Sequence, residues 1–247
     1  NPNAQWQADA AYNIGEISFH KKDYKNAIVA YQKAIAGYEN ALTKLNDEEL
    51  IERAKTRIAL SKLQLAESYA NHDSEGEYQK ILQAYREARR ASMSLSDETL
   101  RSAIEKDALY GEALFLQKLG QKEKSIEAAS NLAEIATTKK DAMGLLQAAD
   151  LLFEAAGNDG NYQKAAEVYE QALKIWQESQ KPVDEQHLRL MARLGFCYLR
   201  MSENAMAEDR DELLRKSIAN YDAVLAESEQ RENPPRPPFP KGGTELV

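Results

Sequence analysis

The side chains best suited to catalysis are few in this chain and far apart. The histidines are His20, His72 and His187, and the single cysteine is Cys197. None of them has a second histidine or cysteine at the spacing of a zinc site. The sequence therefore predicts no catalytic residues, no metal site and no enzymatic activity. We expect each histidine to be solvated or to cap a helix, and Cys197 to be a packed core thiol.

Two glycine-containing stretches are equally poor candidates for ligand binding. Lys241-Gly242-Gly243 lacks the preceding glycine, and the strand and helix, of a phosphate-binding loop. The stretch 157–160, Gly-Asn-Asp-Gly, is too short for a calcium loop and suits a turn between helices. We therefore expect no cofactor.

Helical periodicity dominates the rest of the sequence. In the stretch 160–176, Ala165, Tyr169, Ala172 and Ile175 follow one another at spacings that place them on one helical face. The small residues let a neighbouring helix approach, and the tyrosine fills the space beside them. Because Ala, Leu, Glu, Lys, Gln and Arg dominate and glycine is scarce, the chain favours helix nearly throughout.

Similar faces recur along the chain, as in a repeat protein. Near the N-terminus the face consists of Ala11, Ile14, Gly15 and Ser18, continued by Tyr24, Ala27, Tyr31 and Ala34. The equivalent small position recurs at Ala27, Ile81, Ser125, Ala165 and Ser217, at steps of 54, 44, 40 and 52 residues. The third repeat is degenerate, because Glu112 stands where an apolar residue is expected.

These faces resemble the tetratricopeptide repeat (TPR), most clearly in the first and fourth repeats. A strict TPR step is about 34 residues, so the longer steps here are similar to the long-repeat TPRs of kinesin light chains and bacterial peptide-sensing regulators. The resemblance implies an all-α fold, a right-handed superhelix of about five antiparallel helix pairs over residues 1–232. We expect Asn46 to start one helix in a capping box, and a long polar turn over 202–211.

Residues 233–247 differ in composition from the rest. Their five prolines, in the run 234–240, exclude a helix because proline lacks the amide donor and clashes with the preceding turn. The sequence predicts an extended proline-rich tail. It is an inert extension, a polyproline ligand for another domain, or a segment that self-associates through the groove of another copy.

The TPR resemblance also implies a concave groove lined by the first helix of each pair. The residues placed in it are Asp9, Tyr12, Asn13, Glu16 and His20, then Asp107, Tyr110 and Lys118, and finally Arg189, Arg193, Phe196 and Arg200. Such a groove is acidic at its N-terminal end and basic at its C-terminal end. Arginine forks bind carboxylate or phosphate at two points, and Phe196 could seat an apolar side chain. The alternative is a solvated face of arginines paired with nearby acids.

These features predict a non-catalytic scaffold that binds an extended peptide or helix of a protein partner, acidic where it meets the C-terminal end of the groove. The alternative is a ligand- or peptide-responsive regulator that changes its pitch on binding. A clamp for chaperone tails is not expected, because Tyr12 and Glu16 stand where such TPRs carry lysine and asparagine.

Charge and composition exclude other classes of partner. The net charge of −8 argues against general nucleic-acid binding. No run of about 18 apolar residues is present, so no membrane insertion is expected. With one cysteine and no visible signal peptide, we expect a cytoplasmic location.

Overall fold

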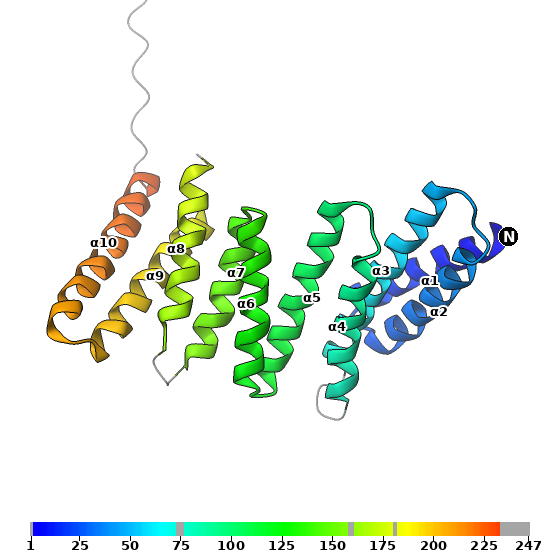
Figure 1. Cartoon of the computed structure of the whole chain (residues 1–247), viewed down its shortest axis with the longest axis horizontal. Coiled ribbons are helices and arrows are strands. Elements are labelled where there is room, and N and C mark those ends of the chain that lie inside the picture. Colours follow the sequence, from blue (N-terminus) through cyan, green and yellow to red (C-terminus); the bar gives the residue numbers. More distant parts are fainter. Residues whose placement is uncertain (1, 73–76, 158–160, 180–181, 233–247) are drawn as a thin grey trace, which may run out of the picture. The chain divides into compact units, whose positions relative to one another are not determined.

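The computed structural model describes residues 2–72, 77–157, 161–179 and 182–232, and the only regular structure in these ranges is helical (Figure 1). The helices are α1 (Pro2–His20), α2 (Tyr24–Leu42), α3 (Glu48–His72), α4 (Tyr78–Ser92), α5 (Glu98–Lys118), α6 (Lys122–Thr138), α7 (Ala142–Ala156), α8 (Gln163–Glu178), α9 (Glu185–Asn204) and α10 (Ala207–Glu232). The predicted all-α class is confirmed.

The chain divides into two compact units, Asn1–Ala155 and Ala156–Val247. In the first unit, consecutive helices from α1 to α6 pack against one another, and α3 also touches α5. In the second unit, α9 packs against both α8 and α10. Helices therefore pack in the order of the sequence, as in a TPR-like solenoid. The handedness of the superhelix and the domain limits 1–232 stay predictions, and the predicted tail lies outside the described residues.

Aspartates fix the starts of several helices by accepting hydrogen bonds from backbone amides of the first turn. The caps are Asp23 for α2, Asp97 for α5 and Asp184 for α9. At α3, Asp47 accepts a hydrogen bond from the Leu50 amide at 3.0 Å. The helix thus begins one residue later than the predicted Asn46 start, because Asp47 provides the capping oxygen.

The predicted long turn over 202–211 is wrong. Helix α9 continues to Asn204 and α10 begins at Ala207, so only two residues separate them. The polar stretch that suggested a turn supplies Glu208 and Asp209 to the first turn of α10. Negative side chains are favourable there because they face the positive end of the helix dipole.

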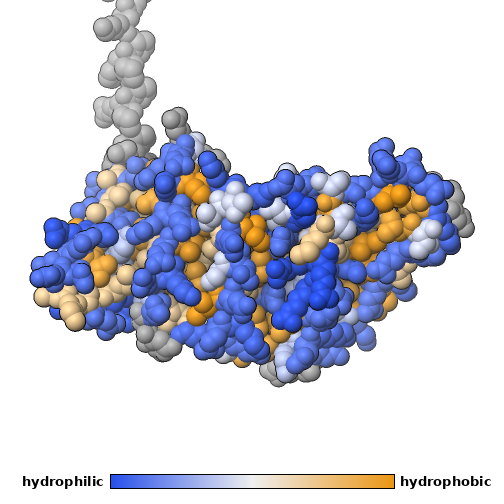
Figure 2. Space-filling model, viewed as in Figure 1, coloured by the Kyte–Doolittle hydropathy of each residue, from blue (hydrophilic) through white to orange (hydrophobic). Residues whose placement is uncertain are grey.

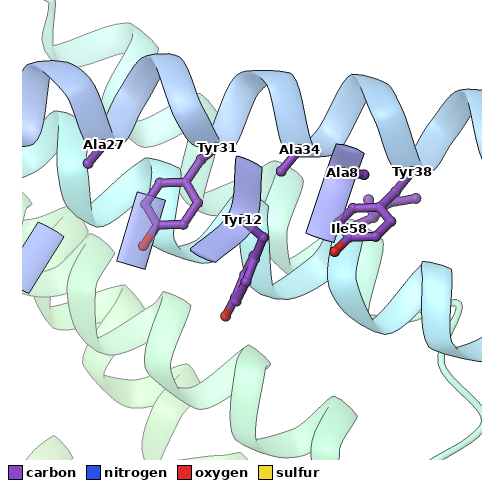
Figure 3. Packing of buried hydrophobic residues seen from close by; sticks show 7 residues of the cluster. All are labelled: Ala8, Tyr12, Ala27, Tyr31, Ala34, Tyr38 and Ile58. Carbon is purple, nitrogen blue, oxygen red and sulfur yellow. The ribbon is translucent and has the colours of Figure 1, made fainter. Parts of the chain in front are cut away.

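Alanines and tyrosines build the core of the first unit. The cluster shown in Figure 3 consists of Ala8, Tyr12, Ala27, Tyr31, Ala34, Tyr38 and Ile58. The rings of Tyr12 and Tyr31 meet edge to face, with their centroids 6.0 Å apart. A Cβ atom on Gly15 would lie 2.6 Å from the Tyr31 ring, so glycine allows this close approach. The same arrangement recurs at Gly111, where an added Cβ would lie 2.5 Å from the ring of Tyr85.

The face of the molecule in Figure 2 is mainly hydrophilic, with apolar side chains scattered among the polar ones. Within the described ranges, the helices lack the length and apolar character needed to cross a membrane.

Candidate functional site

The carboxylates of α1 hold tyrosines of α2 while remaining partly open to solvent. Asp9 accepts a hydrogen bond from the Tyr38 hydroxyl at 2.5 Å and lies 3.5 Å from the guanidinium of Arg53. Glu16 accepts a hydrogen bond from the Tyr31 hydroxyl at 2.6 Å. Both predicted groove residues therefore also stabilise the contact between α1 and α2.

Two further predicted residues of α1 differ in their exposure. Tyr12 is buried, and the guanidinium of Arg57 lies 4.6 Å from the centre of its ring, a cation–π contact. Asn13 is exposed. Asn13 is therefore accessible to a partner, whereas Tyr12 is covered by Arg57, a residue that no sequence pattern indicated.

Carboxylates on two first helices of the first unit affect Glu67, which lies on a third. Burial raises the pKa of Glu67, on α3, to about 7, and the negative charges of Asp107 on α5 and Glu16 on α1 add to this effect. Burial also raises the pKa of Asp107, against the opposing charge of Lys106. Two predicted residues thus share a surface with Glu67, which no sequence pattern had marked.

This shift predicts a pH-dependent stability. Since the carboxyl pKa of Glu67 rises from 4.5 to about 7 on folding, the folded state holds the proton more tightly, and stability falls as the pH rises through that window. One pKa unit corresponds to about 1.4 kcal/mol. Because Glu67 keeps some contact with water, we expect Glu67→Gln to raise the free energy of unfolding by about 2 kcal/mol at pH 8 and to change it little at pH 4. Urea unfolding at both pH values measures this.

The control for that measurement is Glu87→Gln, which changes an exposed glutamate of α4. We expect the control to leave the pH dependence of unfolding unchanged. An equal gain for Glu67→Gln at pH 4 and pH 8 would contradict the assignment.

An ion-pair cluster around buried Glu112 joins α4 to α5. Glu112 is only 5% exposed. Its carboxylate lies 3.3 Å from Nε of Arg86 and 3.7 Å from Nη1 of Arg89, and Arg89 also approaches Glu105 at 3.8 Å. The two arginines explain why the third repeat carries glutamate at a position where the repeat pattern has an apolar residue.

The predicted basic residues lie along α9 in the second unit. They are Arg189, Arg193 and Arg200, and their spacing places them with Phe196 on one side of the helix. Arg200 forms an ion pair with Glu203 at 2.7 Å. Phe196 is half-buried and meets the ring of Tyr162 edge to face at 5.8 Å.

The remaining predicted residues, Tyr110 and Lys118, lie on α5 of the first unit, where Tyr110 is half-buried and Lys118 is exposed. The predicted change in charge, from acidic residues on α1 and α5 to basic residues on α9, involves residues of both units. It stays a prediction.

One histidine differs from expectation. His187 is buried and lies against Trp176, with the ring centres 5.5 Å apart. Burial lowers the pKa of its imidazole. The predicted solvated or capping role is wrong for this residue, because its side chain packs on α8 although its backbone amide lies in the first turn of α9. His20 and His72 are exposed, as expected.

Cys197 is a fully buried free thiol, as predicted. Burial raises the pKa of the thiol to about 12, so the reactive thiolate is scarce at neutral pH. We expect less than about one hundredth of the alkylation rate of a free thiol by iodoacetamide at pH 7.5 in the folded protein, and full reaction in urea. Mass spectrometry of the alkylated chain measures both rates. Rapid labelling of the folded protein would contradict this burial.

No cluster of three or more histidine, cysteine, aspartate or glutamate side chains suited to a metal ion occurs in the part of the chain that the structure describes.

A hollow of about 480 Å³ lies within the second unit, between the start of α8, the end of α9 and the start of α10. Tyr162, Met201, Asp209 and Glu212 are among the residues that line it. This mixture does not form a recognisable catalytic arrangement.

Comparison with known proteins places these features in a family context. Residues 8–36 match the profile of the tetratricopeptide repeat. No curated protein sequence matches the chain. The crystal structure of the MamA protein is similar in fold, with a TM-score of 0.57 and 16% identity over 95% of this chain and 98% of that one.

A second similar structure contains the nearly identical TPR-like repeats of a kinesin-light-chain-type protein from Podosopora anserina. It has a TM-score of 0.54 and 16% identity over 90% of this chain and 96% of the other. At this level of identity the likeness concerns the fold. The chain thus contains one matched tetratricopeptide repeat, at residues 8–36, and has a TPR-like solenoid fold.

Proposed function

We propose that this TPR-repeat protein is a non-catalytic scaffold that binds an extended peptide or a helix of a partner protein along the faces of its first helices. One observation carries the proposal. Helix α3 touches α5, and the negative charges of Glu16 on α1 and Asp107 on α5 both raise the pKa of Glu67 on α3. The first helices of three consecutive pairs therefore present a shared surface in the first unit.

The charges on the two units suggest the chemistry of the partner. The first unit presents Asp9, Glu16 and Asp107, which would attract lysine or arginine side chains. Helix α9 of the second unit carries Arg189 at an exposed position, with Arg193 and Arg200 half-buried on the same side. Guanidinium groups bind carboxylates through paired hydrogen bonds, so this helix would hold an acidic segment of the partner.

Selection from a random peptide display library on the immobilised protein tests the proposal. We expect the selected peptides to contain an acidic segment, and the variant Arg189→Glu/Arg193→Glu/Arg200→Glu to bind them at least about tenfold more weakly. The matched control Lys33→Glu/Arg90→Glu/Arg210→Glu makes the same change in charge at exposed positions of second helices. The control should bind like the unmodified protein, and circular dichroism should show equal helicity for all three.

The reverse result would overturn the proposal. If the control loses the peptides and the α9 variant keeps them, the partner binds the second helices instead. Small-angle scattering with and without a selected peptide separates a scaffold from a responsive regulator, because only the regulator would change its radius of gyration.

A further inference from the structure

Helix α1 carries an apolar stripe that no described residue covers. Trp6 is 73% exposed, and Ile14 and Ile17 are each more than half exposed. Together with exposed Ala10 they follow one another at spacings of three and four residues, which places them on one side of the helix. Exposed Lys21 follows this stripe at the end of the helix.

Helix α10 carries a second apolar stripe, formed by exposed Ile218 and Leu225 with half-buried Leu214 and Tyr221 between the exposed residues and α9. Ile218 is 58% exposed and Leu225 is 61% exposed. The stripe lies beside the face that packs on α9, where Ser217 is buried. Its outer border is acidic, because Asp211, Asp222 and Glu229 are exposed next to it on the helix. In a solenoid such apolar faces normally pack against a neighbouring helix.

The packing of the chain itself indicates what covers these stripes. The second helix of a pair packs on the first helix of the next pair at α2 and α3, at α4 and α5, and at α8 and α9. Among the residues that the structure describes, nothing covers one face of α10, a second helix, or one face of α1, a first helix. We propose that the α10 stripe of one copy docks on the α1 stripe of another copy, head to tail.

The two stripes have the same length, and one pair of charges beside them is complementary. Trp6 to Ile17 and Leu214 to Leu225 both cover twelve residues, a rise of about 16 Å along the helix. Antiparallel packing, as between consecutive helices of a TPR-like solenoid, would place Ile218 opposite Ile14 and Leu225 near Trp6. In the same register Asp211 lies opposite Lys21, an attractive pair of charges.

Contacts between identical faces fit less well. Two α10 stripes would bring their acidic borders together, which is repulsive. Two α1 stripes would leave the acidic border of α10 without a partner. A head-to-tail contact is heterologous, so each added copy leaves one free stripe at either end and the assembly grows with concentration.

Sedimentation velocity of residues 1–247 over a range of concentrations tests the proposal. We expect the unmodified protein to self-associate, and Ile14→Glu/Ile17→Glu and Ile218→Glu/Leu225→Glu to raise the dissociation constant at least about tenfold, so that each variant alone is a monomer. Mixed at equal amounts, the two variants should form a dimer of one copy each, because each still has the stripe that the other lacks.

A matched control adds the same charges elsewhere on α10. Ala219→Glu/Ala226→Glu changes two exposed positions on the side of α10 away from the stripe, and should associate like the unmodified protein. A monomeric unmodified protein at all concentrations would overturn the proposal. So would a dimer that survives the α10 changes and is lost only with the α1 changes, since that result indicates a symmetric α1 contact.

Discussion

Replacing Tyr31 by alanine is expected to lower the free energy of unfolding of the first unit by about 3–5 kcal/mol. Tyr31 is fully buried between Gly15 and Tyr12, and its hydroxyl donates a hydrogen bond to Glu16. The alanine leaves a cavity, because the backbone of α1 has already approached as closely as Gly15 allows. Urea unfolding followed by circular dichroism measures the loss, and hydrogen exchange should locate it in α1 and α2.

Two control variants separate the packing from the hydrogen bond. Tyr31→Phe keeps the ring and removes the hydroxyl, so it should cost only about 1 kcal/mol. Tyr78→Ala removes a tyrosine that is 39% exposed, and should cost less than Tyr31→Ala. If Tyr31→Ala costs no more than Tyr78→Ala, the core described for the first unit is wrong.

Removing both arginines of the α4–α5 cluster is expected to have the second-largest effect. In Arg86→Ala/Arg89→Ala the carboxylate of Glu112 stays buried and loses both cationic partners. An unpaired buried charge typically costs about 3–5 kcal/mol. Because the side chain of Arg86 is about half exposed, water screens part of its interaction, and we expect about 3 kcal/mol at pH 7. Urea unfolding at pH 7 measures the change.

A third substitution distinguishes an unpaired charge from lost arginine packing. Adding Glu112→Leu to the double variant restores the apolar residue expected from the repeat pattern, and should recover most of the lost stability. Arg90→Ala, at an exposed neighbouring position, should change stability by less than about 0.5 kcal/mol. Failure of Glu112→Leu to recover stability would indicate that the arginines act through packing alone.

The sequence by itself determined the helices and most of the faces that they bury, although Ile14, which the repeat pattern placed on the packed face of α1, is 56% exposed. The spacing of Ala27, Tyr31 and Ala34 fixes one buried face of α2, because side chains three or four residues apart share one side of a helix. Local capping by Asp97 and Asp184 likewise follows from neighbouring residues. The predicted helix boundaries failed at a helix start that moved from Asn46 to Asp47 and at the polar stretch after Ser202, which continues as helix.

Part of the candidate site also followed from the sequence. The repeat register assigned Glu16 and Asp107 to first helices of one surface, and the structure has them acting on a common neighbour, Glu67. The register also marked Glu112 as a departure from the apolar pattern. It did not reveal which residues of other helices meet these side chains.

Only the tertiary structure decided those partners. Arg57 lies over Tyr12, and Arg86 and Arg89 surround Glu112, across contacts between residues that are distant in sequence. The burial of His187 against Trp176 has the same origin. Helical spacing defines the side on which a residue lies, whereas its ionisation and burial depend on what the neighbouring helix places opposite it. Which side chain lies opposite depends on how the helices pack.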